Sequence, residues 1–231
     1  MAEASTSQLP AQTPADQRLL ERWQRKLSVM TGLSSSPADI EAYQCRQCET
    51  MRDKVVKSSP IVRFILTHLS LLPDPTPLKD QSATPYLPAS IACVPCKDVA
   101  PGLFAGHDPE TGIFLCQETV IRDEGVLRST LAHELIHLWD HRRFHLDYRN
   151  PRHRACTEIR AANLSGDCSW KNEVNRGHFS IPRQHQLCVR RRALLSLTTG
   201  YSAIPKEEAE RVINEVWDSC FADTRPFDEI Y

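Results

Sequence analysis

The stretch His-Glu-Leu-Ile-His at residues 133–137 constrains the fold of this chain more than any other feature. It matches the H-E-x-x-H pattern, and the apolar residues around it recur at helical spacing. Residues four apart lie on one face of an α-helix, so the imidazoles of His133 and His137 can bind one zinc ion. Glu134 then projects beside them toward a water molecule. The pattern predicts the active-site helix of a zinc metallopeptidase, with Glu134 as the general base.

A third protein ligand must come from another segment, because a catalytic zinc site has three protein ligands and keeps one position for water. We predict Glu158, which lies on a second expected helix over 155–164 that ends at a Ser-Gly pair. A glutamate about twenty residues beyond the second histidine is typical of His-His-Glu zincins. Asp140 and Asp147 are the alternatives, and Asp140 could instead accept the outer N–H of a ligand imidazole.

Other polar side chains near the motif have less defined roles. His141 and His145 follow at helical spacing, but the glycine and third histidine of the metzincin pattern are absent from the sequence. We expect these two histidines to be solvated or to support the loop after the helix, with a second metal site as the alternative. A donor for the tetrahedral oxyanion is also expected, and His178, His185 and Tyr201 are candidates that the sequence does not rank.

Cysteine is unusually frequent in this chain. Two C-x-x-C pairs could form a four-thiolate zinc site, although the interval between them exceeds that of common zinc ribbons. Disulfides are the favoured interpretation, because the other cysteines are scattered like a framework of cross-links. The odd total leaves at least one cysteine unpaired, and the sequence does not fix the pairing. The nine are Cys45, Cys48, Cys93, Cys96, Cys116, Cys156, Cys168, Cys188 and Cys220.

Charge and hydropathy narrow the classes of partner. The chain has 28 Lys and Arg against 29 Asp and Glu, which argues against a dedicated nucleic-acid binder. The longest apolar run, 61–72, is broken by Arg63 and His68, so any membrane contact is expected to be peripheral. The cluster Arg190–Arg192 could face anionic lipid head groups, but a solvated helix face is favoured.

The rest of the sequence predicts a mainly helical α+β fold. Residues 1–17 are expected to form a disordered leader without the arginines of a transit peptide, followed by one zincin-like metalloprotease domain over 18–231. A small antiparallel sheet is expected to precede the motif helix, whose N-cap is Ser129 or Thr130. Its strand residues 113–117 would bind the substrate backbone at a sheet edge, and an ordinary sheet strand is the equally consistent alternative. The expected helices are 18–30, 37–72, 183–199 and 205–221, and the expected strands are 90–93 and 112–120. The expected domain thus has N-terminal helices over 18–72, a sheet and metal core over about 85–170, and C-terminal helices over about 183–222.

Three segments resemble one known family. They are residues 133–170, with the motif and the Ala-Cys-Thr-Glu-Ile-Arg-Ala-Ala-Asn-Leu stretch, residues 188–193, and the ending Asp-Ser-Cys-Phe-Ala-Asp-Thr-Arg-Pro-Phe-Asp at 218–228. The chain is similar over roughly 40–231 to the mitochondrial inner-membrane zinc metalloproteases that assist ATP synthase assembly, in particular to fungal members.

The resemblance implies a place and two roles. The place is the mitochondrial intermembrane space, in peripheral association with the inner membrane, where an oxidative folding route would suit the cysteines. One role is removal of the N-terminal prosequence from subunit 6 of ATP synthase. The other is chaperone-like assistance to membrane-sector assembly intermediates, and an assembly chaperone with a mainly structural zinc helix is the alternative function.

Overall fold

The computed structural model describes residues 36–72, 91–108, 111–178, 183–199 and 202–228, together with Trp23 and Ser28. The chain divides between Arg46 and Gln47, and the unit from Gln47 onward contains the site and both apolar clusters described below. The expected leader lies outside the described residues, as does most of the expected helix over 18–30. The extent of the expected domain, 18–231, stays a prediction.

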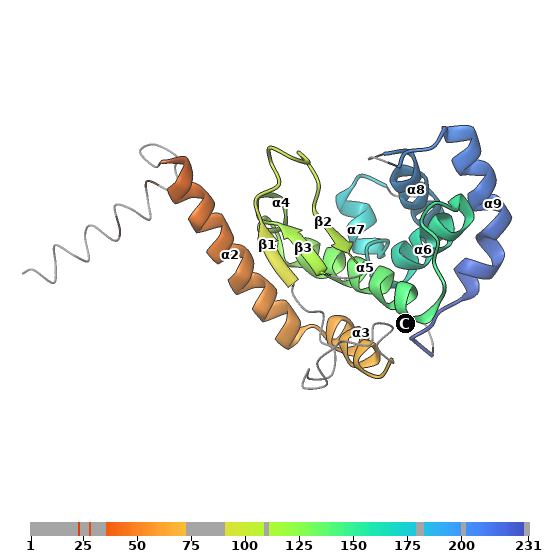
Figure 1. Ribbon diagram of the computed structural model, residues 1–231, viewed down its shortest axis with the longest axis horizontal. Helices are drawn as coiled ribbons and strands as arrows, with labels where there is room; N and C mark the ends of the chain where they lie inside the picture. The colour runs from red at the N-terminus through yellow and green to blue at the C-terminus, as the bar shows by residue number, and fades with distance from the viewer. Residues whose placement is uncertain are drawn as a thin grey trace, which may run out of the picture. The chain divides into compact units, whose positions relative to one another are not determined.

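The expectation of a mainly helical α+β chain is confirmed (Figure 1). The strands are β1 (Ile91–Val94), β2 (Ala105–Asp108) and β3 (Gly112–Cys116). The helices are α2 (Pro37–Ser58), α3 (Pro60–Ser70), α4 (Gln117–Val120), α5 (Glu124–Arg143), α6 (Pro151–Leu164), α7 (Trp170–Asn175), α8 (Gln184–Thr198) and α9 (Lys206–Ala222).

The segment expected to be one helix over 37–72 forms two helices, α2 and α3. The break lies at Ser59 and Pro60, where the Ser59 hydroxyl accepts a hydrogen bond from the Val62 amide at 3.4 Å. Proline at the first position of α3 has no N–H to donate to the preceding turn, so it starts a helix more readily than it continues one.

The sheet differs from the expectation in two ways. Its order is β1-β3-β2, with β1 parallel and β2 antiparallel to β3, so it is mixed and not antiparallel. β3 is the central strand, and it ends at Cys116, where α4 begins. Residues 113–117 therefore offer no sheet edge to a substrate, because both sides of β3 are paired. The strand β2, which the sequence analysis did not predict, is an edge of the sheet formed by the described residues.

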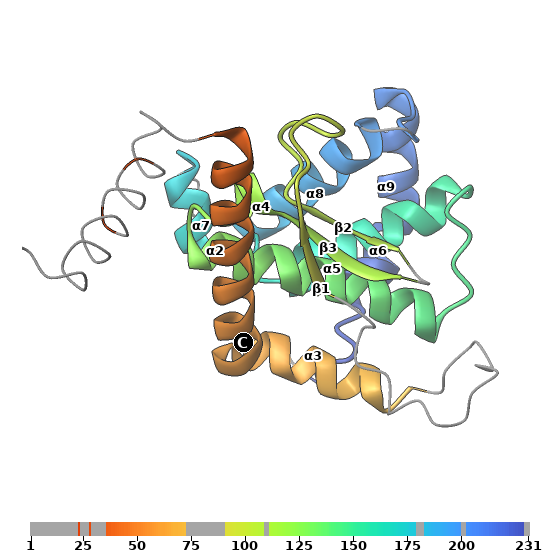
Figure 2. The ribbon, with the colours of Figure 1, turned by 60° about the vertical axis from the view of Figure 1, so that its left-hand side comes forward.

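Two apolar clusters hold the described elements together, and α6 contributes to both. The first joins α3, the sheet and α5 around Leu131, Leu135 and Leu138. The second joins α6, α8 and α9 around Ile159, Val189 and Ile213. Figures 1 and 2 show the strands lying along α5 and the group of α6, α8 and α9 on its other side. The site lies where α5 meets α6.

Four disulfides tie these elements, as the sequence favoured. Two link α2 to β1 and the loop after β1 to the end of β3, through Cys48–Cys93 and Cys96–Cys116. Two link α6 to α9 and the loop after α6 to α8, through Cys156–Cys220 and Cys168–Cys188. Cys45 has a free thiol. The alternative of a four-thiolate zinc site is wrong, because three of its four sulfurs are consumed in disulfides.

Candidate active site

The motif helix α5 begins earlier in the sequence than expected. Its N-cap is Asp123, whose carboxylate accepts a hydrogen bond from the Val126 amide at 3.0 Å, so the assignment to Ser129 or Thr130 is wrong. An aspartate before the first turn satisfies an unpaired amide and complements the helix dipole. The leucines of α5 are fully buried against the first apolar cluster, and this burial fixes the direction of the motif side chains.

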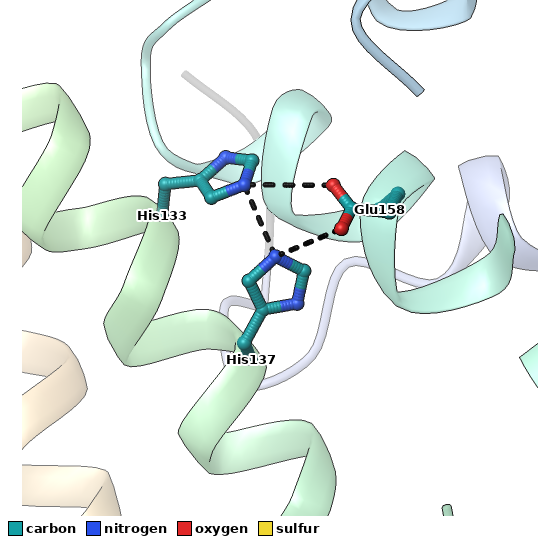
Figure 3. Close-up of side chains that lie close together, drawn as sticks. All are labelled: His133, His137 and Glu158. Carbon is teal, nitrogen blue, oxygen red and sulfur yellow. Dashed lines mark hydrogen bonds and ion pairs between the residues drawn. The ribbon is translucent and has the colours of Figure 1, made fainter. Parts of the chain in front are cut away.

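His133, His137 and Glu158 converge on one point, as predicted (Figure 3). The two Nε2 atoms are 3.0 Å apart, and each lies 3.6 Å from a Glu158 carboxylate oxygen. Ligand atoms bound to a tetrahedral zinc ion at about 2.0–2.1 Å are separated by roughly 3.3 Å. The donor set and its spacing thus fit a metal ion of zinc's size, and no other group of this kind occurs within the described ranges.

The rival third ligands lie away from this point. Asp140 is not part of the cluster and lies behind His137, where it accepts hydrogen bonds from Arg160 and Thr157. Asp147 lies in the loop between α5 and α6, where its carboxylate accepts a hydrogen bond from the Arg149 amide at 2.9 Å. His141 stacks on Tyr148, with ring centroids 6.0 Å apart.

Charges within the cluster suit cation binding. Burial opposes ionisation of Glu158, but the two imidazoles outweigh it and hold the pKa of this carboxyl well below its usual range. Burial likewise lowers the pKa of His133, yet contact with Glu158 and the charge of Glu134 raise it overall. Glu158 is therefore an anion that draws positive charge to this point, which is the electrostatic requirement for holding a metal ion.

A buried relay lies behind His137. Its Nδ1 donates to the Thr157 hydroxyl at 2.9 Å, because that hydroxyl itself donates to Asp140 at 2.8 Å. The proton is thereby kept on Nδ1, which leaves the Nε2 lone pair for a metal. The sequence analysis allowed Asp140 to accept the imidazole N–H directly. In the structure, Asp140 supports the imidazole through the Thr157 hydroxyl instead.

Glu134 is held by two residues that the sequence analysis missed. Its carboxylate lies 3.1 Å from His107 Nδ1, and His107 Nε2 lies 2.8 Å from the Tyr148 hydroxyl. Burial opposes ionisation of Glu134, but the hydrogen bond from His107 and the charge of His133 lower its pKa overall. His107 belongs to β2 and Tyr148 to the loop after α5, and neither segment has a motif that would have revealed it.

A cleft of about 540 Å³ opens onto these groups. One wall is formed by residues 102–107, including β2, and the other by α8. The candidate oxyanion donors do not line it: His178 is exposed, and His185 is bonded to Asn163 at 2.7 Å. Tyr201 lies outside the described residues. His107 is the lining side chain that is hydrogen-bonded to Glu134, and its strand, β2, is an edge of the described part of the sheet.

The arginine cluster of α8 makes contacts within the chain. Arg190 lies over the Trp217 ring at 3.8 Å, Arg191 binds the buried Glu173 at 2.8 Å, and Arg192 binds Asp167 at 2.6 Å. The favoured interpretation as a solvated helix face holds in part, because the side chains of Arg191 and Arg192 are 39% and 38% exposed although all three arginines have a partner within the chain. As for membrane spans, none of the helices in the described ranges is long and apolar enough to cross a bilayer.

Comparison with known proteins gives a consistent result. Residues 46–228 match the model of the peptidase M76 family. The chain is 43% identical to the mitochondrial inner membrane protease ATP23 of Malassezia globosa over 79% of this chain and 76% of the relative. It is 42% identical to the protein of that name in Neosartorya fischeri, over 91% and 88%, and 40% identical to the one in Saccharomyces cerevisiae, over 91% and 95%. No solved structure gives a significant match.

Proposed function

The chain belongs to the peptidase M76 family and is a metallopeptidase, and from this premise we propose that it is a zinc metalloendopeptidase with a zincin-like active site. The observation that carries the proposal is the convergence of His133, His137 and Glu158, with the Glu134 carboxylate beside them on the same cleft. Two imidazoles and one carboxylate are the ligand set of catalytic zinc sites that keep one position open.

The residues divide the work of peptide hydrolysis among them. Zinc bound by His133, His137 and Glu158 would supply Lewis acidity to the scissile carbonyl and to a water molecule. Glu134, steadied by His107, accepts the proton of the attacking water and passes it to the leaving amine. The edge strand β2, which lines the cleft and pairs only with β3 within the described part of the sheet, orients the substrate backbone by strand addition.

We propose the mitochondrial intermembrane space as the location and the subunit 6 precursor of ATP synthase as the substrate. The names of the relatives place those proteins at the mitochondrial inner membrane, and four disulfides suit an oxidising compartment. Peripheral contact with the inner membrane and removal of the subunit 6 prosequence follow from the resemblance described above. So does assistance to membrane-sector assembly intermediates, which would not require cleavage.

The test compares wild-type protein with Glu134→Gln. We expect both proteins, purified without reductant, to contain about one zinc per chain by elemental analysis, because the substitution leaves the three ligands intact. Cleavage of a peptide that spans the prosequence junction of subunit 6 should fall by about a thousandfold in the variant, since it lacks the general base. Glu208→Gln, on α9, is the matched control and should cleave like wild type.

Two results would contradict the proposal. Wild-type turnover by Glu134→Gln removes the general-base assignment, and zinc retained by Glu158→Ala removes the third ligand. Restoration of ATP synthase assembly in cells by Glu134→Gln separates the assembly role from proteolysis, because that variant keeps the fold and the metal.

A further inference from the structure

The carboxyl-terminal segment Asp223–Phe227 follows α9 and packs back against the first apolar cluster. Its turn is closed by a hydrogen bond from the Phe227 amide to the Thr224 carbonyl at 2.9 Å. The Phe227 ring stacks on Phe64 of α3, with centroids 4.9 Å apart. The segment is thus docked by its own aromatic anchor and does not simply trail from α9.

Arg160, on α6, joins this segment to the interior. Its side chain is only 2% exposed, and its Nε donates to Asp140 at 2.9 Å. One terminal nitrogen donates to the Asp223 carbonyl at 2.6 Å and the other to the Arg225 carbonyl. A buried guanidinium is tolerated only where its donors are satisfied, and here the segment satisfies both terminal nitrogens.

The contacts continue without a break to the candidate metal centre. Asp140 is 1% exposed and accepts the hydroxyl of Thr157, which in turn accepts the Nδ1 proton of His137. Partners behind a ligand imidazole set its orientation and basicity, and changing them typically costs about 10–100-fold in metal affinity. Consecutive hydrogen bonds therefore connect the Asp223 carbonyl to a metal ligand.

We propose that the segment Asp223–Phe227 is a working part of the metal centre, and that through Arg160, Asp140 and Thr157 it fixes the His137 imidazole in the orientation that binds metal. The inference rests on the proposed zinc function. Arg160 is a positioning residue in this scheme, because it touches neither the metal nor the substrate.

A simpler role for Arg160 is to neutralise the buried Asp140 carboxylate. Arg160→Lys distinguishes the two, because lysine keeps the positive charge but cannot bridge Asp140 and two carbonyls with one fork of donors. Phe227→Ala tests the segment itself. It removes the aromatic anchor and leaves Arg160, Asp140, Thr157 and His137 unchanged.

The experiment measures zinc affinity by competition with a chelator, on full-length protein whose folding is checked by thermal unfolding. We expect Arg160→Lys and Phe227→Ala each to weaken zinc binding by about tenfold or more. The visible absorption of the cobalt-substituted protein should also change, since it reports ligand geometry. Phe221→Ala is the matched control, because Phe221 is similarly half-buried and close in sequence but stacks on Trp217 in the second cluster.

The outcomes are separable. Weaker zinc binding by both variants and not by Phe221→Ala supports the inference. Wild-type affinity and an unchanged cobalt spectrum in folded Phe227→Ala overturn it, and should that variant not fold, the same result in Arg160→Lys overturns it. Equal weakening in Phe221→Ala also overturns it, because the effect would then follow general destabilisation. Absence of zinc binding by the wild type contradicts the proposed function itself.

Discussion

Tyr148 connects the loop after α5 to the general base. Burial raises the pKa of its phenol, so the hydroxyl stays protonated at neutral pH. It can then donate to His107 Nε2 at 2.8 Å, which leaves the proton on Nδ1 to be donated to Glu134. The direction of both hydrogen bonds keeps the carboxylate ionised and pointed into the cleft.

We expect Tyr148→Phe to lower kcat by about tenfold without changing zinc content. Loss of one hydrogen bond of about 1–1.5 kcal/mol releases the His107 ring and with it the orientation of Glu134. KM should stay nearly constant, because the phenol is placed to act on the base and not on the bound peptide. Steady-state kinetics with a quenched fluorescent peptide checks this, with Tyr43→Phe on α2 as the control. A change in KM alone would contradict the positioning role.

At this scale, spacing predicted part of the site and not the rest. His133 and His137 could be predicted from the sequence because residues four apart on a helix share one face. Glu158 could be predicted because it lies on a second helix that follows. His107, Tyr148 and Thr157 were not, since each depends on how separate elements pack. A supporting role for Asp140 behind a ligand imidazole was predicted from its place one turn after His137. The Thr157 hydroxyl that lies between them could not be predicted, because its position depends on how α6 packs against α5.

At the scale of elements, both walls of the cleft carry exposed apolar side chains. Leu103 and Phe104, before β2, are 40% and 43% exposed, and Leu195 of α8 is 50% exposed. Asp167 and Arg192, the charged lining residues outside the catalytic group, are paired with each other. Beyond the metal centre, the cleft therefore offers a peptide exposed apolar side chains on both walls, hydroxyl groups, and charged side chains that are paired with each other.

We expect the enzyme to prefer apolar side chains next to the scissile bond. A subunit 6 junction peptide with leucine at both flanking positions should be cleaved at least tenfold more efficiently, as kcat/KM, than one with glutamate there. Leu195→Ser should reduce kcat/KM for the leucine peptide by about fivefold, because part of the roughly 1.5–3 kcal/mol of a buried leucine is lost.

Leu187→Ser provides the control for this preference. Leu187 lies on the same helix and is 51% exposed, but it does not line the cleft. Equal loss of activity in Leu187→Ser and Leu195→Ser, or better cleavage of the glutamate peptide, would show that these walls do not select the substrate.

The elements themselves were predictable where their patterns are strong. The helices α5, α6, α8 and α9 were found because apolar spacing recurs over each of them, although α5 and α6 begin earlier than their expected first residues. The division of α2 from α3 was missed because the apolar pattern continues past Pro60. The edge strand β2, Ala-Gly-His-Asp, has no β-branched residue and forms only because β3 supplies its hydrogen bonds.

At the scale of the whole described unit, α6 is the element on which both apolar clusters depend. Ala161 and Leu164 belong to the first cluster, and Ala155 and Ile159 to the second. Around the axis of α6, Glu158 lies between the face that packs on the first cluster and the face that packs on the second. Its position relative to α5 therefore depends on the packing of both clusters. Cys156, on the same helix, is joined to Cys220 of α9 across a sequence separation of 64 residues.

We therefore expect the Cys156→Ser/Cys220→Ser double variant to lose stability and metal binding together. Opening a loop of this length increases the entropy of the unfolded chain and should lower the free energy of unfolding by about 4 kcal/mol, measured by urea denaturation. Zinc affinity should fall as well, because α9 also carries the segment that binds Arg160. Cys45→Ser is the control, since its thiol is free, and should match wild type in both measurements. If the double variant were destabilised but bound zinc with wild-type affinity, the metal centre would be independent of the α6–α9 cross-link, and packing of the two apolar clusters alone would hold Glu158 in place.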